Sequence, residues 1–198
     1  MIVIFVGAQG AGKTISIVKF LLDDWLNGKN ILTNFGLKEI SYDFLTKKML
    51  LEYSQNQEQI NNTSIGITEL HTIIDSRNSA ANKFMTWFFL QLRKRGVTLY
   101  GDTQHFGQID KRVRDETDMF IECQTYLLTE TVDGKPSLKP TFKKEFTDEE
   151  FSILFIKNKC YTKFIINGIL GYKIKSYYFK ASQVAKYYDT NEVIDISR

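Results

Sequence analysis

A glycine-rich segment near the amino end of the chain has the residue types and the spacing of a phosphate-binding loop. It matches the pattern G-x-x-x-x-G-K-[ST] in full and consists of Gly7, Ala8, Gln9, Gly10, Ala11, Gly12, Lys13 and Thr14. Glycines let backbone N–H groups turn toward phosphate oxygens, and a helix that begins at the loop adds a favourable dipole. Lys13 is expected to reach the β- and γ-phosphates, and Thr14 to bind Mg²⁺ through its hydroxyl. A nucleotide and Mg²⁺ are therefore the expected ligands.

The residues around this loop form the elements that such chemistry requires. Residues 1–6 are a short apolar run that predicts a buried strand, and residues 13–26 are expected to form a helix that stops at Gly28. Further strands are expected at 31–33, 64–68 and 97–100, and further helices at 43–53, 79–95 and 110–115. This alternation predicts an α/β fold, a P-loop NTPase sheet with helices on both faces. Ligands of such sheets bind at the carboxyl ends of the strands.

Hydrolysis also requires a metal-side strand and a carboxylate that orients water. The best candidate is the apolar strand 64–68, which is followed by Glu69, the expected water-polarising carboxylate. Thr68 stands where such strands usually carry Asp, so we expect it to hydrogen-bond a metal-bound water. The residues expected on the metal side are therefore Thr14, Thr68 and Glu69.

Two other acids are rivals for the metal-side position, and an amide follows one of them. Asp102 also ends an apolar strand, and Asp75 is a weaker rival. Gln104 follows the strand that carries Asp102. An amide at this place is expected to contact the γ-phosphate and so to sense whether that phosphate is present.

An arginine from another subunit is expected to compensate the charge on the γ-phosphate. Arg93 and Arg95, in the last turn of the helix at 79–95, are the preferred candidates. Cations at this position also stabilise a helix through its dipole, without any catalysis. The expected catalytic residues are then Lys13, Glu69, Gln104, Arg93 and Arg95.

Several motifs follow one another in a characteristic order. They are the phosphate-binding loop, Ile67-Thr-Glu69, Leu92-Arg-Lys-Arg-Gly96, Asp102-Thr-Gln104, the basic segment Asp110-Lys-Arg-Val-Arg114 and Tyr188-Asp-Thr-Asn-Glu192. This order resembles the FtsK/HerA-type group of DNA-pumping ATPases, and within it the small genome-packaging ATPases of archaeal turreted icosahedral viruses. The resemblance is firm over residues 1–118.

This resemblance implies an ATP-hydrolysing hexameric ring that translocates double-stranded DNA and packages a viral genome. It also implies Glu69 as the catalytic carboxylate, Gln104 as the sensor and an arginine that acts in trans. A capsid or portal-vertex protein is a further partner to be expected. The alternatives are a Zot-like assembly ATPase of filamentous phages, a small P-loop nucleotide kinase, and a scaffold that binds nucleotide without hydrolysing it.

The second part of the chain, 119–198, has a different pattern from the ATPase core at 1–118. Strands are expected at 119–128, 141–146, 151–157, 161–166 and 169–179, and a helix at 182–188. Asp133-Gly134 and Asn167-Gly168 are strong hairpin signals. This β-rich extension is expected to pack on the core, and the two parts could form one continuous domain.

Composition limits the class of protein. Hydrophobic residues make up 43% of the chain, enough for a core, and the net charge of +3 permits contact with nucleic acid. No apolar run approaches the roughly 20 residues that cross a bilayer. The expected location is the cytoplasm of an infected host cell, or association with the virion. Cys123 and Cys160 are expected to be free thiols, with a disulfide as the alternative.

Overall fold

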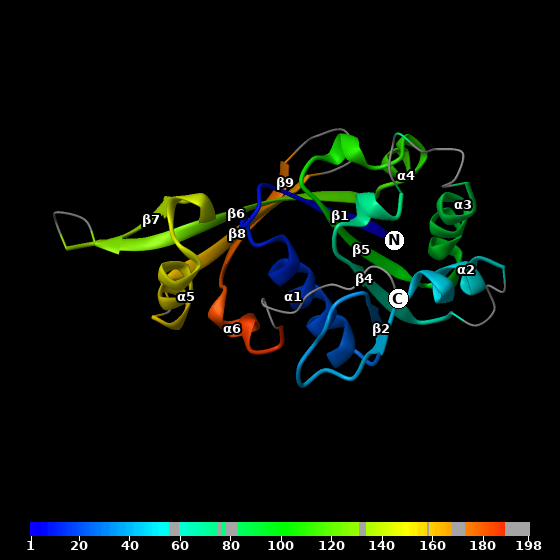
Figure 1. Cartoon of the computed structure of the whole chain (residues 1–198), viewed down its shortest axis with the longest axis horizontal. Coiled ribbons are helices and arrows are strands. Elements are labelled where there is room, and N and C mark those ends of the chain that lie inside the picture. The colour runs from blue at the N-terminus through cyan, green and yellow to red at the C-terminus, as the bar shows by residue number, and fades with distance from the viewer. Residues whose placement is uncertain are drawn as a thin grey trace.

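One mixed β-sheet forms the centre of the molecule in the computed structural model (Figure 1). The residues described are 1–55, 60–74, 77, 83–130, 134–157, 159–167 and 173–188, apart from a few side chains inside helices and strands. The strands are β1 (Ile2–Val6), β2 (Asn30–Thr33), β3 (Asp43–Phe44), β4 (Thr63–Ile67), β5 (Thr98–Thr103), β6 (Met119–Glu130), β7 (Pro136–Pro140), β8 (Cys160–Asn167) and β9 (Lys173–Lys180). The α-helices are α1 (Lys13–Leu26), α2 (Lys47–Gln55), α3 (Lys83–Gln91), α4 (Lys111–Asp115), α5 (Asp148–Ile156) and α6 (Ser182–Ala185). Short 3₁₀-helices are η2 (Leu70–Thr72), η3 (Leu92–Arg95), η4 (Phe106–Gln108) and η5 (Lys143–Glu145).

The sheet is parallel around β1 and antiparallel toward its C-terminal strands. Its order is β3-β2-β4-β5-β1-β6-β8-β9, and β7 pairs with β6 outside this path. Strand β1 is parallel to both of its neighbours, β5 and β6, and β4 is parallel to β5. Strand β6 is antiparallel to β7 and β8, and β8 is antiparallel to β9. The predicted fold class is confirmed. The boundary at residue 118 stays a prediction, and β6 lies in the same sheet as β1.

Helices cover both faces of the parallel part of the sheet. In β1, Ile2, Ile4 and Val6 pack on one face and Val3 and Phe5 on the other, because side chains alternate along a strand. The first face is covered by α2, α3 and α4, and the second by α1 and α6. Helix α1, which follows the glycine-rich loop, is therefore packed along the face next to β1 and β5.

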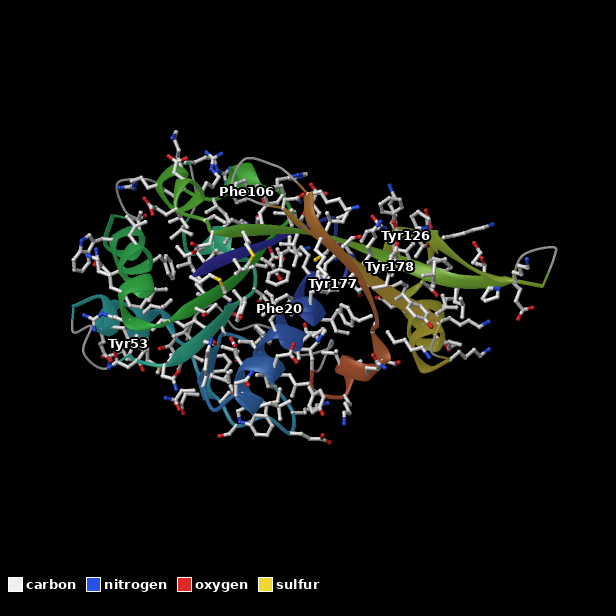
Figure 2. The ribbon with its side chains drawn as sticks, turned by 180° about the vertical axis from the view of Figure 1, so that it is seen from behind. Phe20, Tyr53, Phe106, Tyr126, Tyr177 and Tyr178 are labelled. Atoms are coloured by element: carbon white, nitrogen blue, oxygen red, sulfur yellow. The ribbon has the colours of Figure 1, made fainter. Side chains whose placement is uncertain are left out.

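Aromatic side chains join α1 to the antiparallel strands. The ring of Phe164 on β8 lies 5.7 Å from the ring of Phe20 on α1 and 5.1 Å from the ring of Tyr177 on β9. Figure 2 labels Phe20 and Tyr177, which appear close to each other near the middle of the molecule. The C-terminal strands thus pack against the same helix that follows the phosphate-binding loop.

The elements that surround the loop agree with the sequence predictions. Strand β1, helix α1 and strand β4 have the expected positions, and the segment expected as a helix at 110–115 is α4. Gly28 follows the end of α1 with a φ of 80°, as expected for a glycine stop. The helix expected at 79–95 is α3 followed by η3, and residues 78–82 lie outside the described part.

One of the predicted strands is a helix in the structure. Residues 151–157 were expected to form a strand but lie mostly in helix α5, which begins at Asp148. A capping box begins this helix, because the hydroxyl of Thr147 accepts from the N–H of Glu150 (3.2 Å) and the Glu150 carboxylate accepts from the N–H of Thr147 (2.8 Å). The length of the apolar run at 151–157 is compatible with either a strand or a helix. The capping box favours the helix.

Other boundaries also differ from the sequence predictions. The helix expected from Asp43 begins only at Lys47, where the hydroxyl of Thr46 accepts from the N–H of Met49, and Asp43–Phe44 is β3. Residues 141–146, expected as a strand, contain η5, while the strand β7 at Pro136–Pro140 was missed. The turn residues expected at 133 and 168 lie outside the described residues, although both hairpins form. The C-terminal helix is limited to α6.

Two further observations concern the described residues. Cys123 and Cys160 are both buried, free thiols. No helix in this part of the chain is long and apolar enough to span a membrane.

Gly101 on β5 is required for the packing of η2. A Cβ atom at Gly101 would lie 3.2 Å from Cγ of the fully buried Leu70 and closer still to its Cδ2. We expect Gly101→Ala to lower the free energy of unfolding by about 1–3 kcal/mol, because overpacking forces side chains or backbone to move. Urea denaturation followed by circular dichroism measures this change. Gly107→Ala is the matched control, since no atom lies within 4 Å of its Cβ position. Equal stability of both variants would contradict the packing argument.

Candidate active site

The phosphate-binding loop connects the carboxyl end of β1 to the amino end of α1 (Figure 1). Gly10 and Gly12 have φ angles of 74° and 87°, in the left-handed region that favours glycine. Gly12 is also the N-cap of α1, so the unpaired N–H groups of the first helical turn lie at the loop. This arrangement attracts anions through both N–H donors and the helix dipole.

Lys13 lies within the loop and is only 8% exposed. Its Nζ donates a hydrogen bond to the carbonyl oxygen of Ala8 at 3.3 Å. An ammonium carries three N–H donors, so this bond is compatible with contacts to phosphate oxygens. The lysine side chain thus lies against the loop, and its contact with phosphate stays a prediction.

The carboxylate of Asp102 joins the loop to the strand-end acid. Its Oδ2 accepts from the Thr14 hydroxyl at 3.1 Å, and its Oδ1 accepts from the backbone N–H of Glu69 at 2.9 Å. Asp102 is 1% exposed, and burial raises its pKa to about 6 although the Glu69 N–H and the Lys13 charge oppose this rise. The sequence analysis considered Asp102 only as a rival, on the signal of an acid at the end of an apolar strand.

Glu69 follows β4 at the same edge of the sheet. Its backbone is in the left-handed region, with φ 53° and ψ 46°, which is uncommon for a residue other than glycine. Its side chain is 40% exposed, and its Oε2 lies 3.4 Å from Nδ1 of His71. The carboxylate is therefore accessible to water while its backbone is fixed by Asp102.

The structure brings several predicted residues to one edge. Val6 at the end of β1 pairs with Thr103 on β5, and Ile67 at the end of β4 pairs with Gly101. Gln104 follows β5 directly and has an exposed side chain. The loop, Glu69 and Gln104 thus share the carboxyl edge, and their catalytic roles stay predictions.

Thr68 contacts a residue other than those of the loop. Its N–H donates to Oδ1 of Asn34 at 2.9 Å, its hydroxyl lies 3.4 Å from the same oxygen, and its carbonyl accepts from Nδ2 of Asn34 at 3.1 Å. Asn34 follows β2, on the side of β4 away from β5. The Thr68 side chain is satisfied there, and its predicted role near the metal stays a prediction.

Arg95 lies far from the site of its own chain. It belongs to η3, which precedes the first residue of β5, whereas the loop lies beyond the last residue of β1 and β5. A six-residue strand spans about 20 Å, so Arg95 is at the opposite edge of the sheet. Arg93 is in the same 3₁₀-helix, and its side chain lies outside the described part of the structure. Either arginine could act only on the site of another chain.

The β-rich part of the chain supports the loop directly. The hydroxyl of Thr125 on β6 donates to the carbonyl oxygen of Gly10 at 2.6 Å. A Cβ atom at Gly12 would lie 2.6 Å from Oγ1 of Thr162 on β8, and one at Gly10 would overlap Cβ of Lys143. These close approaches explain why both positions carry glycine. No residue of this part was predicted in the site from the sequence.

A pocket of about 490 Å³ opens beside the loop. It is lined by Ala8, Gln9, Phe142, Lys143, Lys144, Phe146 and Asp148. Phe142 is 41% exposed, and Nζ of Lys144 lies 5.7 Å from the centre of its ring. The volume is in the range of small-molecule sites, so a ligand bound at the loop has room to extend along η5.

The donor set at the loop fits Mg²⁺. In phosphate sites this ion uses one or two protein oxygens and completes its shell with phosphate oxygens and water. The Thr14 hydroxyl, held by the Asp102 carboxylate, supplies oxygen atoms of this kind. A cluster of three or more His, Cys, Asp or Glu is absent from the residues that the structure describes, and such a shell does not require one.

A glycine-rich loop between a central parallel strand and a helix, with a buried carboxylate bound to its threonine, defines a P-loop ATPase. The Zonular occludens toxin (Zot) family model matches residues 1–132 of the 198, so the chain belongs to the Zot family. The sequence analysis held Zot-like motors as an alternative to packaging ATPases, and it is this family that the sequence match supports. A comparison with curated protein sequences gives no match.

Solved structures share the fold. The N-terminal domain of zonular occludens toxin from Neisseria meningitidis aligns with a TM-score of 0.52 and 17% identity, over 72% of this chain and 95% of that one. The genome packaging NTPase B204 from Sulfolobus turreted icosahedral virus 2, in complex with AMPPCP, aligns with a TM-score of 0.54 and 13% identity, over 90% of this chain and 96% of that one. The DNA-packaging ATPase B204 from Sulfolobus turreted icosahedral virus aligns with a TM-score of 0.51 and 14% identity, over 90% of this chain and 96% of that one. The predicted resemblance to packaging ATPases of turreted icosahedral viruses is confirmed as a likeness of fold.

The Thr125 hydroxyl offers a test of the support from β6. We expect Thr125→Val to weaken ATP binding several-fold, because the Gly10 carbonyl loses its hydrogen bond. Without this bond the geometry of the loop is no longer fixed. Fluorescence titration with a labelled ATP analogue measures the Kd. Thr129→Val on the same strand removes a hydrogen bond to Ser137 instead and should leave the Kd unchanged. A similar loss in both variants would argue against a specific role of Thr125.

Proposed function

We propose that the chain is an ATP-hydrolysing motor that assembles into a ring, translocates double-stranded DNA and packages a viral genome. The observation that carries this proposal is the meeting of the loop lysine, the loop threonine, a buried aspartate and the strand-end Glu69 at one edge of the sheet. These groups are of the kinds that phosphoryl transfer to water requires, for binding phosphate, for binding a metal ion and for orienting a water molecule, and this supports the proposal. B204 is a genome packaging NTPase and a DNA-packaging ATPase, which suggests that this chain uses ATP hydrolysis to move DNA.

In this proposal the residues have distinct roles. The loop N–H groups and Lys13 bind the phosphates, and Thr14 contributes a hydroxyl to Mg²⁺, with Thr68 and Glu69 on the same side. The metal, when bound, neutralises charge on the β- and γ-phosphates. Glu69 orients the attacking water, and Gln104 senses the γ-phosphate. Arg93 or Arg95 of a neighbouring subunit stabilises the charge that develops during transfer.

The proposed partners follow from the same reasoning. The resemblance to DNA-pumping ATPases suggests a hexameric ring around double-stranded DNA, and a capsid or portal-vertex protein where the genome enters. Such a motor would work in the cytoplasm of the infected host cell or attached to the virion. The match to the Zot family favours a second candidate, an ATPase that acts in phage assembly, with which the same active site is compatible.

ATP turnover with and without DNA tests the proposed function. We expect purified protein to hydrolyse ATP, and linear double-stranded DNA to raise the rate several-fold in low salt but much less in high salt, because phosphate contacts dominate such binding. Lys13→Ala should lose most turnover. Glu69→Gln should retain ATP binding and lose turnover by about 100-fold or more, as expected for loss of a catalytic base. Turnover that DNA does not change would favour the assembly ATPase, and full activity of Glu69→Gln would exclude its proposed role.

A mixing experiment tests the arginine in trans. Lys13→Ala and Arg95→Ala proteins should each be inactive, and their mixture should recover part of the activity, because some interfaces combine an intact loop with an intact arginine. The same mixture with Arg93→Ala distinguishes the two candidates. Lys94→Ala, in the same 3₁₀-helix, is the control and should remain active alone. A mixture that co-assembles without any recovery would contradict a shared site.

A further inference from the structure

We infer that Asp102 on β5 supplies the carboxylate of the metal site, one strand away from the position where that carboxylate is expected. The inference rests on the proposed function, since it concerns the Mg²⁺ that accompanies ATP. The expected position, at the end of β4 and directly before Glu69, is occupied by Thr68, which has no carboxylate. Another acid must therefore supply the carboxylate if the metal site contains one.

The register of the sheet sets the two positions side by side. Ile67 on β4 pairs with Gly101 on β5, so the next residues, Thr68 and Asp102, follow at the same level on neighbouring strands. Adjacent strands lie about 4.8 Å apart. Strand β5 lies between β4 and β1 in the sheet, so an acid on β5 is one strand nearer to the loop. The carboxylate of Asp102, on the strand next to β4, can therefore reach the phosphate-binding loop.

The contact with Thr14 is the one that a metal-site carboxylate needs. Oδ2 of Asp102 accepts from the Thr14 hydroxyl at 3.1 Å. A hydroxyl that donates its proton to a carboxylate has its lone pairs directed elsewhere, available to a cation. Partners of this kind orient metal ligands and raise their affinity for the metal. Asp102 thus acts as a positioning residue for Thr14, and its negative charge adds to the attraction of the cation.

The second oxygen of Asp102 connects the metal side to the water side. Oδ1 accepts from the backbone N–H of Glu69 at 2.9 Å. Glu69 has a φ of 53°, a conformation that costs free energy in a residue other than glycine and persists only where the surroundings impose it. The Asp102 carboxylate is one such constraint, and the contact of Leu70 with Gly101 is another. One side chain therefore fixes the distance between Thr14 and the backbone of the proposed catalytic carboxylate.

Burial supports a functional reason for this acid. Asp102 is 1% exposed, and a buried carboxylate is costly unless it is paired and hydrogen-bonded. Thr68 meanwhile is hydrogen-bonded to Asn34, on the far side of β4. Of the two neighbouring positions, Thr68 therefore binds the residue that follows β2, and Asp102 binds the threonine of the loop.

Metal binding, rather than turnover, tests this inference. We would measure the affinity for Mn²⁺ by electron paramagnetic resonance in the presence of saturating AMPPCP. Asp102→Asn, which keeps the shape and one acceptor oxygen, should weaken Mn²⁺ binding by about 10–100-fold, as is typical for loss of a partner that orients a ligand. Asp102→Glu, which keeps the charge but displaces it, should give a smaller loss.

Asp110→Asn makes the same exchange at another buried aspartate, one that accepts from the N–H of Arg112 at the start of α4, and it should change Mn²⁺ affinity less than about threefold. Binding of labelled nucleotide in EDTA shows that each variant is folded and should remain near the wild-type value. Unchanged Mn²⁺ affinity in Asp102→Asn, or an equal loss of affinity in Asp110→Asn, would overturn the inference. Because the readout needs neither DNA nor hydrolysis, a failure of DNA-stimulated turnover would leave this result intact and is distinguishable from it.

Discussion

The buried carboxylate of Asp102 is the contact on which the geometry of the site depends. It holds the hydroxyl of Thr14 and the backbone of Glu69 with its two oxygens, and these residues belong to segments that are far apart in the sequence. A charge in this position is stable only because N–H and O–H donors and the ammonium of Lys13 surround it. The parallel register of β1, β5 and β4 brings these groups together, so the sheet determines the site before any ligand binds.

The β-rich part of the chain is integral to the site. Its strand β6 pairs with β1 on the side opposite to β5. Strand β1, which leads into the phosphate-binding loop, therefore has β5 with Asp102 on one side and β6 with Thr125 on the other. Lys143 and Thr162 lie so close to Gly10 and Gly12 that larger side chains would not fit at these two positions, and Thr125 donates a hydrogen bond to the Gly10 carbonyl. A movement of the loop on nucleotide binding must therefore carry β6, β8 and η5 with it or break these contacts. The same part extends well beyond the core as the hairpin of β6 and β7 (Figure 1).

The parts of the fold with strong local signals could be predicted from the sequence, and the parts that depend on tertiary contacts could not. The bounds of α1 follow from glycines at Gly12 and Gly28, which act within a few residues. The segment at 151–157 was assigned wrongly because a short apolar run fits a strand and a buried helix equally, and the decisive signal was the capping box of Thr147 and Glu150.

The site shows the same division between local and tertiary information. The loop motif, Glu69 and Gln104 are recognisable because each follows an apolar strand. Asp102 has the same local signal, and its rank among the acids depends on the strand order, which places β5 between β4 and β1. Sequence spacing alone cannot give this order, since β5 is the last of these three strands in the chain. The contacts of Thr125 and Thr162 with the loop had no motif at all, because a threonine that faces a glycine is recognisable only once the two are adjacent.

The position of the arginines has a consequence for assembly. The loop lies at the carboxyl edge of the parallel strands and Arg95 at the amino edge, so a chain presents the two halves of the proposed site on opposite sides. A head-to-tail contact, in which the amino edge of one subunit faces the carboxyl edge of the next, joins the two halves at every interface. Such heterologous contacts close into rings when the rotation between subunits allows it. The proposed role of an η3 arginine therefore requires a neighbouring subunit, because the arginine and the loop of one chain lie at opposite edges of the sheet.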